Sequence, residues 1–267
     1  MHKSVTPLAA ASLLMSLPNA QADEGADLAK QLANPVASLI SVPIDIDLDS
    51  NLGPNETGKR TLLVTKPVVP IELNQEWNLI SRTILPFISI KSLTPGMEDE
   101  SGMGDIQASF FLSPKAPTDS GWIWGVGPIA LLPSATEDAL GNDKWGLGPT
   151  GVALKQQGAL TYGLLANHVW SYAGDDARTD YTRSFVQPFF TYTTKTATSF
   201  TLQTESTYDW ESEEWSVPVN LIAAQVLKLG DQLLQVRAGL RYWADAPNGA
   251  GPEEWGFKLG VTLLFPK

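Results

Sequence analysis

The sequence predicts an all-β fold: a closed antiparallel β-barrel of the bacterial outer membrane with about twelve strands, following a signal peptide and a short helix. Three observations predict it. Segments of about ten residues alternate apolar and polar side chains, as tilted strands that cross a bilayer do. The connections between these segments alternate between long acidic stretches and short turns. After residue 22, no stretch approaches the ~18 apolar residues that a membrane-spanning helix requires.

Composition narrows the class of protein further. Hydrophobic residues make up 43% of the chain and charged residues 18%, a balance that argues against disorder. The net charge of -11 disfavours a nucleic-acid partner, because phosphates require a basic patch. The chain has no cysteine, so no disulfide framework or thiolate site is expected.

Residues 1–22 have the features of a secretory signal peptide. His2 and Lys3 precede an apolar run from Val5 to Leu17, and the small-residue site AQA at 20–22 follows. We therefore expect export, with a mature chain that starts near Asp23.

Residues 23–37 are expected to form a periplasmic N-terminal segment. Within it only 24–33, EGADLAKQLA, looks helical, and this helix would lie either in the periplasm or tucked into the barrel mouth.

Residues 38–267 are expected to form the transmembrane barrel. Its segments are rich in Val, Ile, Thr and aromatic residues, they lack a 3.6-residue period, and their even number suits a closed bacterial barrel. The predicted strands are 38–48, 59–69, 77–87, 104–113, 121–132, 145–154, 160–170, 183–192, 199–208, 215–225, 233–243 and 255–265.

The connections indicate which end of the barrel faces outward. Long acidic stretches such as PSATEDALGNDK and SYAGDDARTDYT alternate with short turns such as KQQGA and TTKTAT. Outer-membrane barrels keep long loops outside and short turns in the periplasm. Both termini are therefore expected on the periplasmic side.

The last predicted strand shows the alternation clearly. Phe257, Leu259 and Val261 should face lipid, whereas Lys258 and Thr262 should face a polar interior. Since every strand edge must be paired in lipid, this strand should close on the first. Four prolines inside the segments predict bulges or misplaced boundaries, because proline removes a ladder hydrogen bond: Pro43, Pro128, Pro188 and Pro218.

Tryptophan lies near the segment ends, where amphipathic rings favour the boundary between membrane and water. Two girdles are expected: Trp77, Trp122 and Trp124 on the periplasmic side, and Trp145, Trp170, Trp210, Trp215, Trp243 and Trp255 on the outer side. The alternative is that these rings cap the core of a soluble protein.

Several stretches resemble a known family. LANPVASLISVP from Leu32, WNLISRTILP from Trp77, GDIQASFFLSPK from Gly104, WGLGP, QPFFTY and the ending LLFPK are similar to the bacterial outer-membrane transporters of the meta-pathway phenol-degradation family. The resemblance implies an outer-membrane barrel associated with uptake of small compounds, aromatic ones among them. It assigns no functional residue.

Polar residues on the inward faces of the strands are the candidate pore lining. Alternation along the strands places Arg237, Arg241, Lys258 and Glu205 on the inward face. Lys66 and Arg82 are expected to point inward too, because a basic side chain facing lipid at mid-bilayer costs about 2–4 kcal/mol. One interpretation is a partly cationic constriction that selects small anionic or polar solutes. The other is a network of salt bridges that fills the barrel and holds its shape.

Catalytic and metal sites find little support in the sequence. His168 and Ser171 lie three residues apart on one strand and so point to opposite faces, which does not suit a nucleophile and its base. Paired carboxylates such as Asp175 with Asp176 are interpreted as solvated loops rather than calcium ligands. No catalytic residue, metal or cofactor is expected.

We therefore expect an outer-membrane channel or transporter for passive or facilitated uptake of small solutes, aromatic or anionic compounds among them, and not an enzyme. Its expected partners are outer-membrane lipid and a small-molecule solute, and the sequence gives no oligomeric state. Three alternatives stay open: a non-conducting structural or ligand-binding barrel, a membrane-bound hydrolase, and a soluble periplasmic β-protein.

Overall fold

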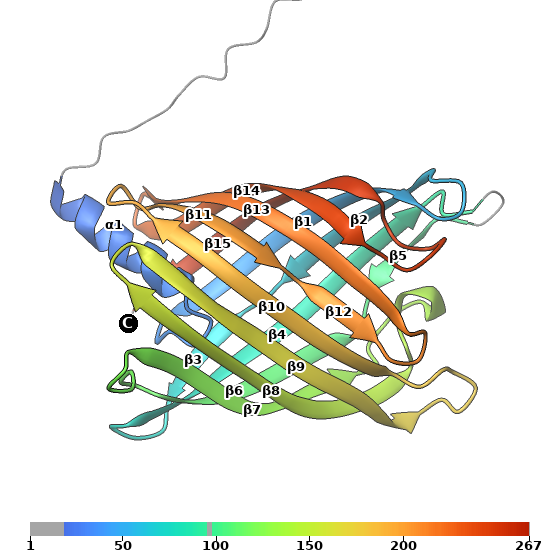
Figure 1. The fold of residues 1–267 in the computed structure, drawn as a ribbon, viewed down its shortest axis with the longest axis horizontal. Coiled ribbons are helices and arrows are strands. Elements are labelled where there is room, and N and C mark those ends of the chain that lie inside the picture. The colour runs from blue at the N-terminus through green and yellow to red at the C-terminus, as the bar shows by residue number, and fades with distance from the viewer. Residues whose placement is uncertain (1–18, 95–97, 267) are drawn as a thin grey trace, which may run out of the picture.

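The computed structural model describes residues 19–94 and 98–266 and is a closed β-barrel with one helix, α1 (Asn19–Leu32), at one end (Figure 1). The predicted signal peptide lies outside the described residues except for 19–22, which belong to α1. No helix among the described residues combines the length and the apolar character needed to cross a membrane.

Fifteen strands and one short 3₁₀ helix follow α1 in the described part of the chain. The strands are β1 (Ile40–Leu52), β2 (Gly58–Thr65), β3 (Val68–Glu72), β4 (Trp77–Lys91), β5 (Glu100–Met103), β6 (Ile106–Pro114), β7 (Trp122–Leu132), β8 (Lys144–Gln157), β9 (Leu160–Gly174), β10 (Thr182–Thr193), β11 (Thr198–Thr204), β12 (Ser206–Asp209), β13 (Glu214–Leu229), β14 (Gln232–Asp245) and β15 (Glu254–Phe265), with η1 (Asp138–Leu140) between β7 and β8.

Three of these strands continue the strand before them across a short break. β2 and β3 both pair with β1 and β4, β5 and β6 both pair with β4, and β11 and β12 both lie between β10 and β13. The barrel wall therefore has twelve antiparallel strands. The predicted number of strands is confirmed, and each strand lies at its predicted place in the sequence.

The wall closes through the first and last strands. β15 pairs with β1 in an antiparallel register that runs from Ile40 opposite Phe265 to Leu48 opposite Phe257. The pairing leaves neither terminal strand with an open edge, as a sheet surrounded by hydrocarbon requires. The predicted closure is confirmed.

Proline disturbs the ladder less than the sequence suggested. A register shift occurs at Val217/Pro218, whereas Pro43 and Pro188 lie inside β1 and β10 in an unbroken register. The break between β11 and β12 has a related cause: Glu205 donates its N–H to the carbonyl of Pro218 at 3.4 Å, and Pro218 has no N–H to donate in return.

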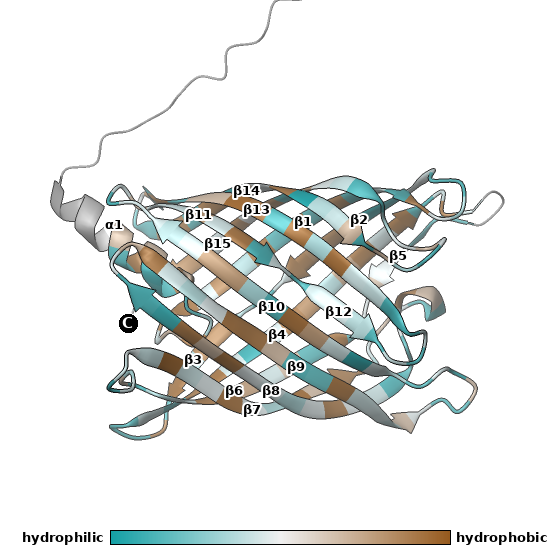
Figure 2. Ribbon diagram, in the orientation of Figure 1, coloured by the Kyte–Doolittle hydropathy of each residue, from teal (hydrophilic) through white to brown (hydrophobic). Residues whose placement is uncertain are grey.

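Side chains alternate between the two faces of the wall, as the striping in Figure 2 shows. The outward side chains include large apolar residues that are more than a third exposed in the isolated chain, such as Leu164, Phe190, Leu202, Leu221 and Leu259. Aromatic rings bracket this apolar band: Trp77 packs against Trp124 at one end, and Tyr208 packs against Trp210 and Trp215 at the other. A barrel with this exterior is suited to the bacterial outer membrane.

The two ends of the barrel differ as predicted. The long connections lie at one end, whereas the short turns, α1 and the C-terminus lie at the other (Figure 1).

The N-terminal helix occupies the mouth at the short-turn end, which was one of its two expected positions. Leu28 and Ala29 of α1 pack into an apolar cluster with Ala197, Val226 and Leu264 of the wall. A hydrogen bond from Gln156 Nε2 to the carbonyl of Lys30, 2.8 Å long, fixes its C-terminal turn.

The chain that follows α1 continues into the barrel interior. Val36 is 5% exposed and packs against the inward side chains Ile80, Phe111 and Leu165. Glycine at position 125 makes room for it, since a Cβ there would lie 3.1 Å from Val36 Cγ1.

Candidate functional site

The charged interior begins with a feature that the sequence analysis missed, a row of aspartates on β1. In the run IDIDLD, Asp45, Asp47 and Asp49 are at most 4% exposed and face inward, while Ile46 and Leu48 face outward. Strict alternation places all three carboxylates on one face of the strand. The alternation that predicts an inward Lys258 on the last strand also holds in this run, so the inward direction of the three aspartates could have been predicted from the sequence.

All six predicted pore-lining residues point into the barrel. Arg237 and Arg241 come from β14, Lys258 from β15 and Arg82 from β4, while Lys66 and Glu205 lie at the breaks after β2 and β11. Arg241 is 3% exposed and Lys258 is 2% exposed. Whether the six line a conducting path belongs to the proposal below.

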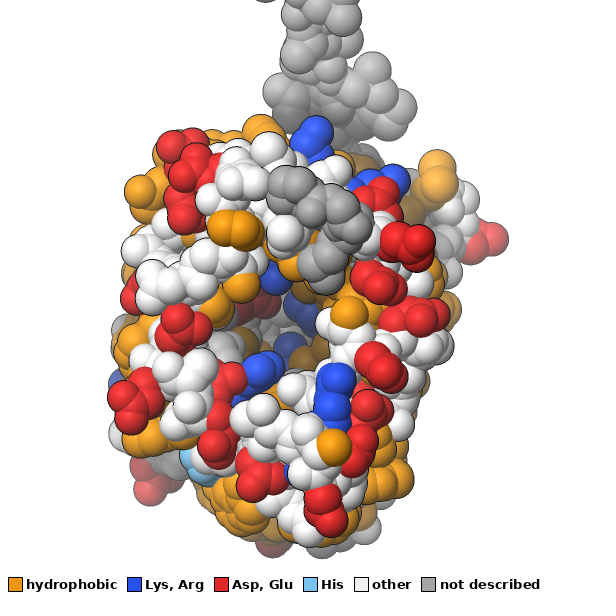
Figure 3. Space-filling view, turned by 90° about the vertical axis from the view of Figure 1, so that its right-hand side faces the viewer, with side chains coloured by type: hydrophobic (Ala, Val, Ile, Leu, Met, Phe, Trp, Pro, Cys, Tyr) orange, Lys and Arg blue, Asp and Glu red, His pale blue; other side chains and the backbone are white. Residues whose placement is uncertain are grey.

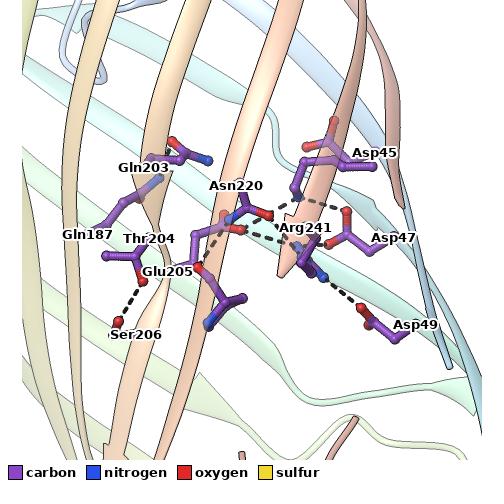
Figure 4. Close-up of polar contacts among 12 residues, drawn as sticks. Asp45, Asp47, Asp49, Gln187, Gln203, Thr204, Glu205, Ser206, Asn220 and Arg241 are labelled. Atoms are coloured by element: carbon purple, nitrogen blue, oxygen red, sulfur yellow. Dashed lines mark hydrogen bonds and ion pairs between the residues drawn. The ribbon is translucent and has the colours of Figure 1, made fainter. Parts of the chain in front are cut away.

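Asp47, the middle carboxylate of the row, lies between two cations. Arg241 Nη2 lies 2.7 Å from Asp47 Oδ2, and Lys258 Nζ lies 2.7 Å from Asp47 Oδ1. Arg241 is oriented by Asn220, whose Oδ1 accepts a hydrogen bond from Arg241 Nε at 2.9 Å (Figure 4). Two cations therefore share one buried carboxylate across the seam where the barrel closes.

Glu205 reaches the same group of charges from the break between β11 and β12. Its carboxylate lies 3.4 Å from Arg241, 3.5 Å from Lys258 and 3.6 Å from Lys66. One glutamate thus contacts three cations that come from three different strands. Through Lys66 it links the wall at the end of β11 to the wall at the end of β2, beyond the seam between β15 and β1.

Asp45 and Asp49 extend the network toward the two ends. Asp45 binds Arg237, with Nη2 to Oδ1 at 2.5 Å, and lies 3.6 Å from Lys66. Asp49 binds Arg60, with Nη2 to Oδ2 at 2.8 Å. A charge kept in a low-dielectric lumen is costly unless it is paired, which accounts for the density of these contacts.

Trp243 corrects the predicted outer girdle. Its Nε1–H donates to Asp49 Oδ1 at 2.9 Å, and its ring lies 5.4 Å from the Arg60 guanidinium and 5.7 Å from that of Arg241. It shares the inward face of β14 with Arg237 and Arg241, because all three numbers are odd. Position near a strand end predicted the girdle, but parity decides which face the ring occupies.

A cavity of about 210 Å³ lies between this charged network and the chain that follows α1. The network side of the cavity carries Asp45, Lys66, Arg82, Glu205, Arg237 and Lys258. Residues 31–35 of the N-terminal segment line it too. Leu165, Phe189 and Ile222 provide an apolar part of its wall. We call this cavity the chamber.

The opposite end of the barrel is hollowed and opens among the long loops. Figure 3 shows acidic side chains around the rim of this hollow and basic side chains deeper inside it. Acidic loops therefore surround an entrance that leads to a basic interior.

His168 belongs to the outer surface of the wall, not to the lumen. Its Nδ1 lies 2.9 Å from Ser184 Oγ, and Trp210 Nε1–H donates to that same oxygen at 2.9 Å. Ser171 instead donates to Asp180 at 3.1 Å, on the other face of β9. His168 and Ser171 therefore lie on opposite faces of β9, as predicted. The imidazole of His168 contacts the rings of Trp170 and Trp210 in the aromatic girdle.

Within the described residues, no group of three or more His, Cys, Asp or Glu side chains is arranged to hold a metal ion. The carboxylates of the lumen are neutralised by arginine and lysine instead.

Comparison with known proteins supports the fold alone. No protein-family model matches the chain, and neither does any curated protein. An outer membrane channel from Pseudomonas putida F1 is similar in structure, with a TM-score of 0.67 at 15% identity, over 85% of this chain and 96% of that one. The NanC porin gives a TM-score of 0.49 at 13% identity, over 84% of this chain and 98% of that one. The meta-pathway phenol-degradation family is not confirmed by these comparisons.

Proposed function

We propose that the chain is an outer-membrane channel through which small polar solutes diffuse passively toward the periplasm. The observation that carries the proposal is a charged, hollow interior inside a wall whose exterior is apolar. A barrel built only to be anchored in lipid gains nothing from ten ionised side chains in its lumen, because buried ion pairs contribute little net stability.

The proposed path has three parts. A solute enters among the long acidic loops, passes a constriction where Glu205 and Asp47 share Arg241 and Lys258, and reaches the chamber beside the N-terminal segment. Selectivity arises at the constriction, where the fixed charges replace part of the solute's hydration shell. Release to the periplasm requires passage past α1 or a shift of it.

We also propose the candidate pore lining as the groups that a solute meets, namely Lys66, Arg82, Glu205, Arg237, Arg241 and Lys258. Small anionic compounds suit the basic members of this set. Small aromatic compounds, which the family resemblance implied, would contact Leu165 and Phe189 on the apolar wall.

A second candidate is a barrel that holds its shape and does not conduct. Two observations favour it: Arg241 and Lys258 are almost completely buried, and Val36 packs inside the wall against Phe111. In that case the ion pairs fill the lumen, and a solute has no passage.

Liposome swelling separates the two functions. Proteoliposomes should swell in isotonic solutions of neutral and anionic solutes below about 500 Da, a rough limit for a barrel of this width. Absence of swelling with every solute, in vesicles that contain correctly folded protein, would favour the non-conducting barrel.

A further inference from the structure

The chamber carries a charge opposite to that of the whole chain. Its wall includes four basic side chains, Lys66, Arg82, Arg237 and Lys258, and two acidic ones, Asp45 and Glu205. It therefore has an excess of two positive charges inside a protein whose net charge is -11. Such an excess in a lumen walled by low-dielectric protein attracts anions.

Arg82 is the basic group of the chamber that has no partner of its own. Its guanidinium is attracted through space by Glu205 and Asp45. Among the described residues, however, none accepts a hydrogen bond from it or lies within 4.0 Å as an ion-pair partner. An arginine presents five N–H donors in a planar fork that matches a carboxylate, so this group is equipped to bind one.

A second donor group of the chamber, the side-chain amide of Gln203, is uncommitted as well. Gln203 accepts a hydrogen bond from Gln187 at 3.0 Å, but its own amide N–H groups donate to no described residue. Polar groups inside a protein are nearly always paired, so donors of Arg82 and Gln203 that face a ligand-sized cavity without a protein partner point to a ligand.

The apolar wall distinguishes organic from inorganic anions. Leu165, Phe189 and Ile222 line the same cavity as the basic side chains, and hydrocarbon gains free energy when it leaves water for such a surface. Sulfate or phosphate has no hydrocarbon, so it can interact with the basic side chains of the chamber but gains nothing from its apolar wall. The volume of about 210 Å³ lies below the ~300–1,000 Å³ of drug-sized ligand pockets, so the ligand must be small.

We infer that the chamber is a binding site for small organic carboxylates, with Arg82 as the group that holds the carboxylate. A dicarboxylate of a few carbons matches the excess of two charges, places its chain against Leu165 and Phe189, and gives Gln203 an acceptor. Lys66 contributes attraction because its own carboxylate contacts, both at 3.6 Å, are long. This inference rests on the proposed channel function, whose solute class it specifies.

Calorimetry on the detergent-solubilised full chain tests binding without requiring conduction. Succinate is the probe, succinamide its neutral counterpart of similar size, and sulfate the inorganic dianion. We expect succinate to bind at least tenfold more tightly than either. Equal binding of sulfate, or no detectable binding of succinate, would overturn the inference even if the channel conducts.

Substitutions then locate the site. Arg82→Gln should weaken succinate binding about tenfold or more, as the loss of a hydrogen bond to a charged group predicts. Arg82→Lys keeps the positive charge but loses the planar fork of donors, so its affinity for succinate should lie between those of the wild type and Arg82→Gln. Arg60→Gln is the matched control, because Arg60 is also a lumenal cation but pairs with Asp49 and does not line the chamber.

Conduction provides the second measurement. In planar bilayers, succinate should reduce the chloride current of the wild type and of Arg60→Gln but not that of Arg82→Gln. A wild type that binds succinate through Arg82 without conducting would contradict the channel and support the site. Equal succinate affinity in Arg82→Gln and the wild type would overturn the site whether or not the channel conducts.

Discussion

Glu205 is the residue whose replacement tests the constriction most sharply. Its side chain is 17% exposed and contacts Lys66, Arg241 and Lys258 at 3.4–3.6 Å. Glu205→Gln keeps the shape of the side chain and removes its charge. The three cations then lose one carboxylate that they share, and the chamber changes from two excess positive charges to three.

The expected loss of stability follows from what remains after the substitution. Removing one partner of a buried ion pair costs about 3–5 kcal/mol because the other charge is left uncompensated. Here each cation keeps a second carboxylate: Lys66 keeps Asp45, and both Arg241 and Lys258 keep Asp47. We therefore expect the lower end, about 3 kcal/mol less free energy of unfolding.

Two measurements check this expectation. Urea unfolding of the protein in vesicles gives the free energy of unfolding, and the reversal potential in a KCl gradient gives the ion selectivity. Glu205→Gln should be less stable and more anion-selective than the wild type. Glu253→Gln, an exposed acidic residue before β15, is the control and should change neither value appreciably. A Glu205→Gln protein with wild-type stability and selectivity would refute the role of Glu205 at the constriction.

Three further predictions concern the lumen, an outer loop and the helix. Trp243→Phe should lower the free energy of unfolding by about 1.5–3 kcal/mol through loss of its hydrogen bond to the Asp49 carboxylate, and an unchanged urea midpoint would contradict the inward placement. Hydrogen bonds from Lys144 and Ser171 lower the pKa of Asp180, so the contacts of Asp180 that hold the outer loop should persist as pH falls to 3.8, the ordinary pKa of an aspartate, and be lost below it. Proteolysis of this loop at a series of pH values measures the loss. An Asp180→Asn variant with the same pH profile would exclude Asp180 as its cause. Leu28→Glu, which places a charge in the apolar contact of α1, should release the helix and raise single-channel conductance, whereas wild-type conductance would show that α1 does not restrict the mouth.

Alternation along single strands was enough to predict much of the molecule. It gave the twelve strands, the closure of the last on the first, and the inward direction of Arg237, Arg241 and Lys258. The reason is that the side-chain period of a strand is a local property, which requires no knowledge of its neighbours. The predicted girdle position of Trp243 is wrong because its odd number places the ring on the inward face of β14, although it lies near the end of that strand.

Pairing across the barrel could not be predicted in the same way. Arg241 and Asp47 lie 194 residues apart in the chain and meet only because β14, β15 and β1 take one particular register. The inward aspartates of IDIDLD were recognisable from the sequence, but their partners depend on that register. The place of α1 depends equally on apolar contacts with distant turns, such as the one at Ala197.

The reversal potential of the wild-type protein in planar bilayers tests the central claim most directly. Reconstituted from detergent into a KCl gradient, the protein should open a stepwise conductance that carries chloride in preference to potassium, because the chamber has an excess of two positive charges. A folded protein that inserts and gives no current, or a current that prefers potassium, would contradict a channel with a basic chamber.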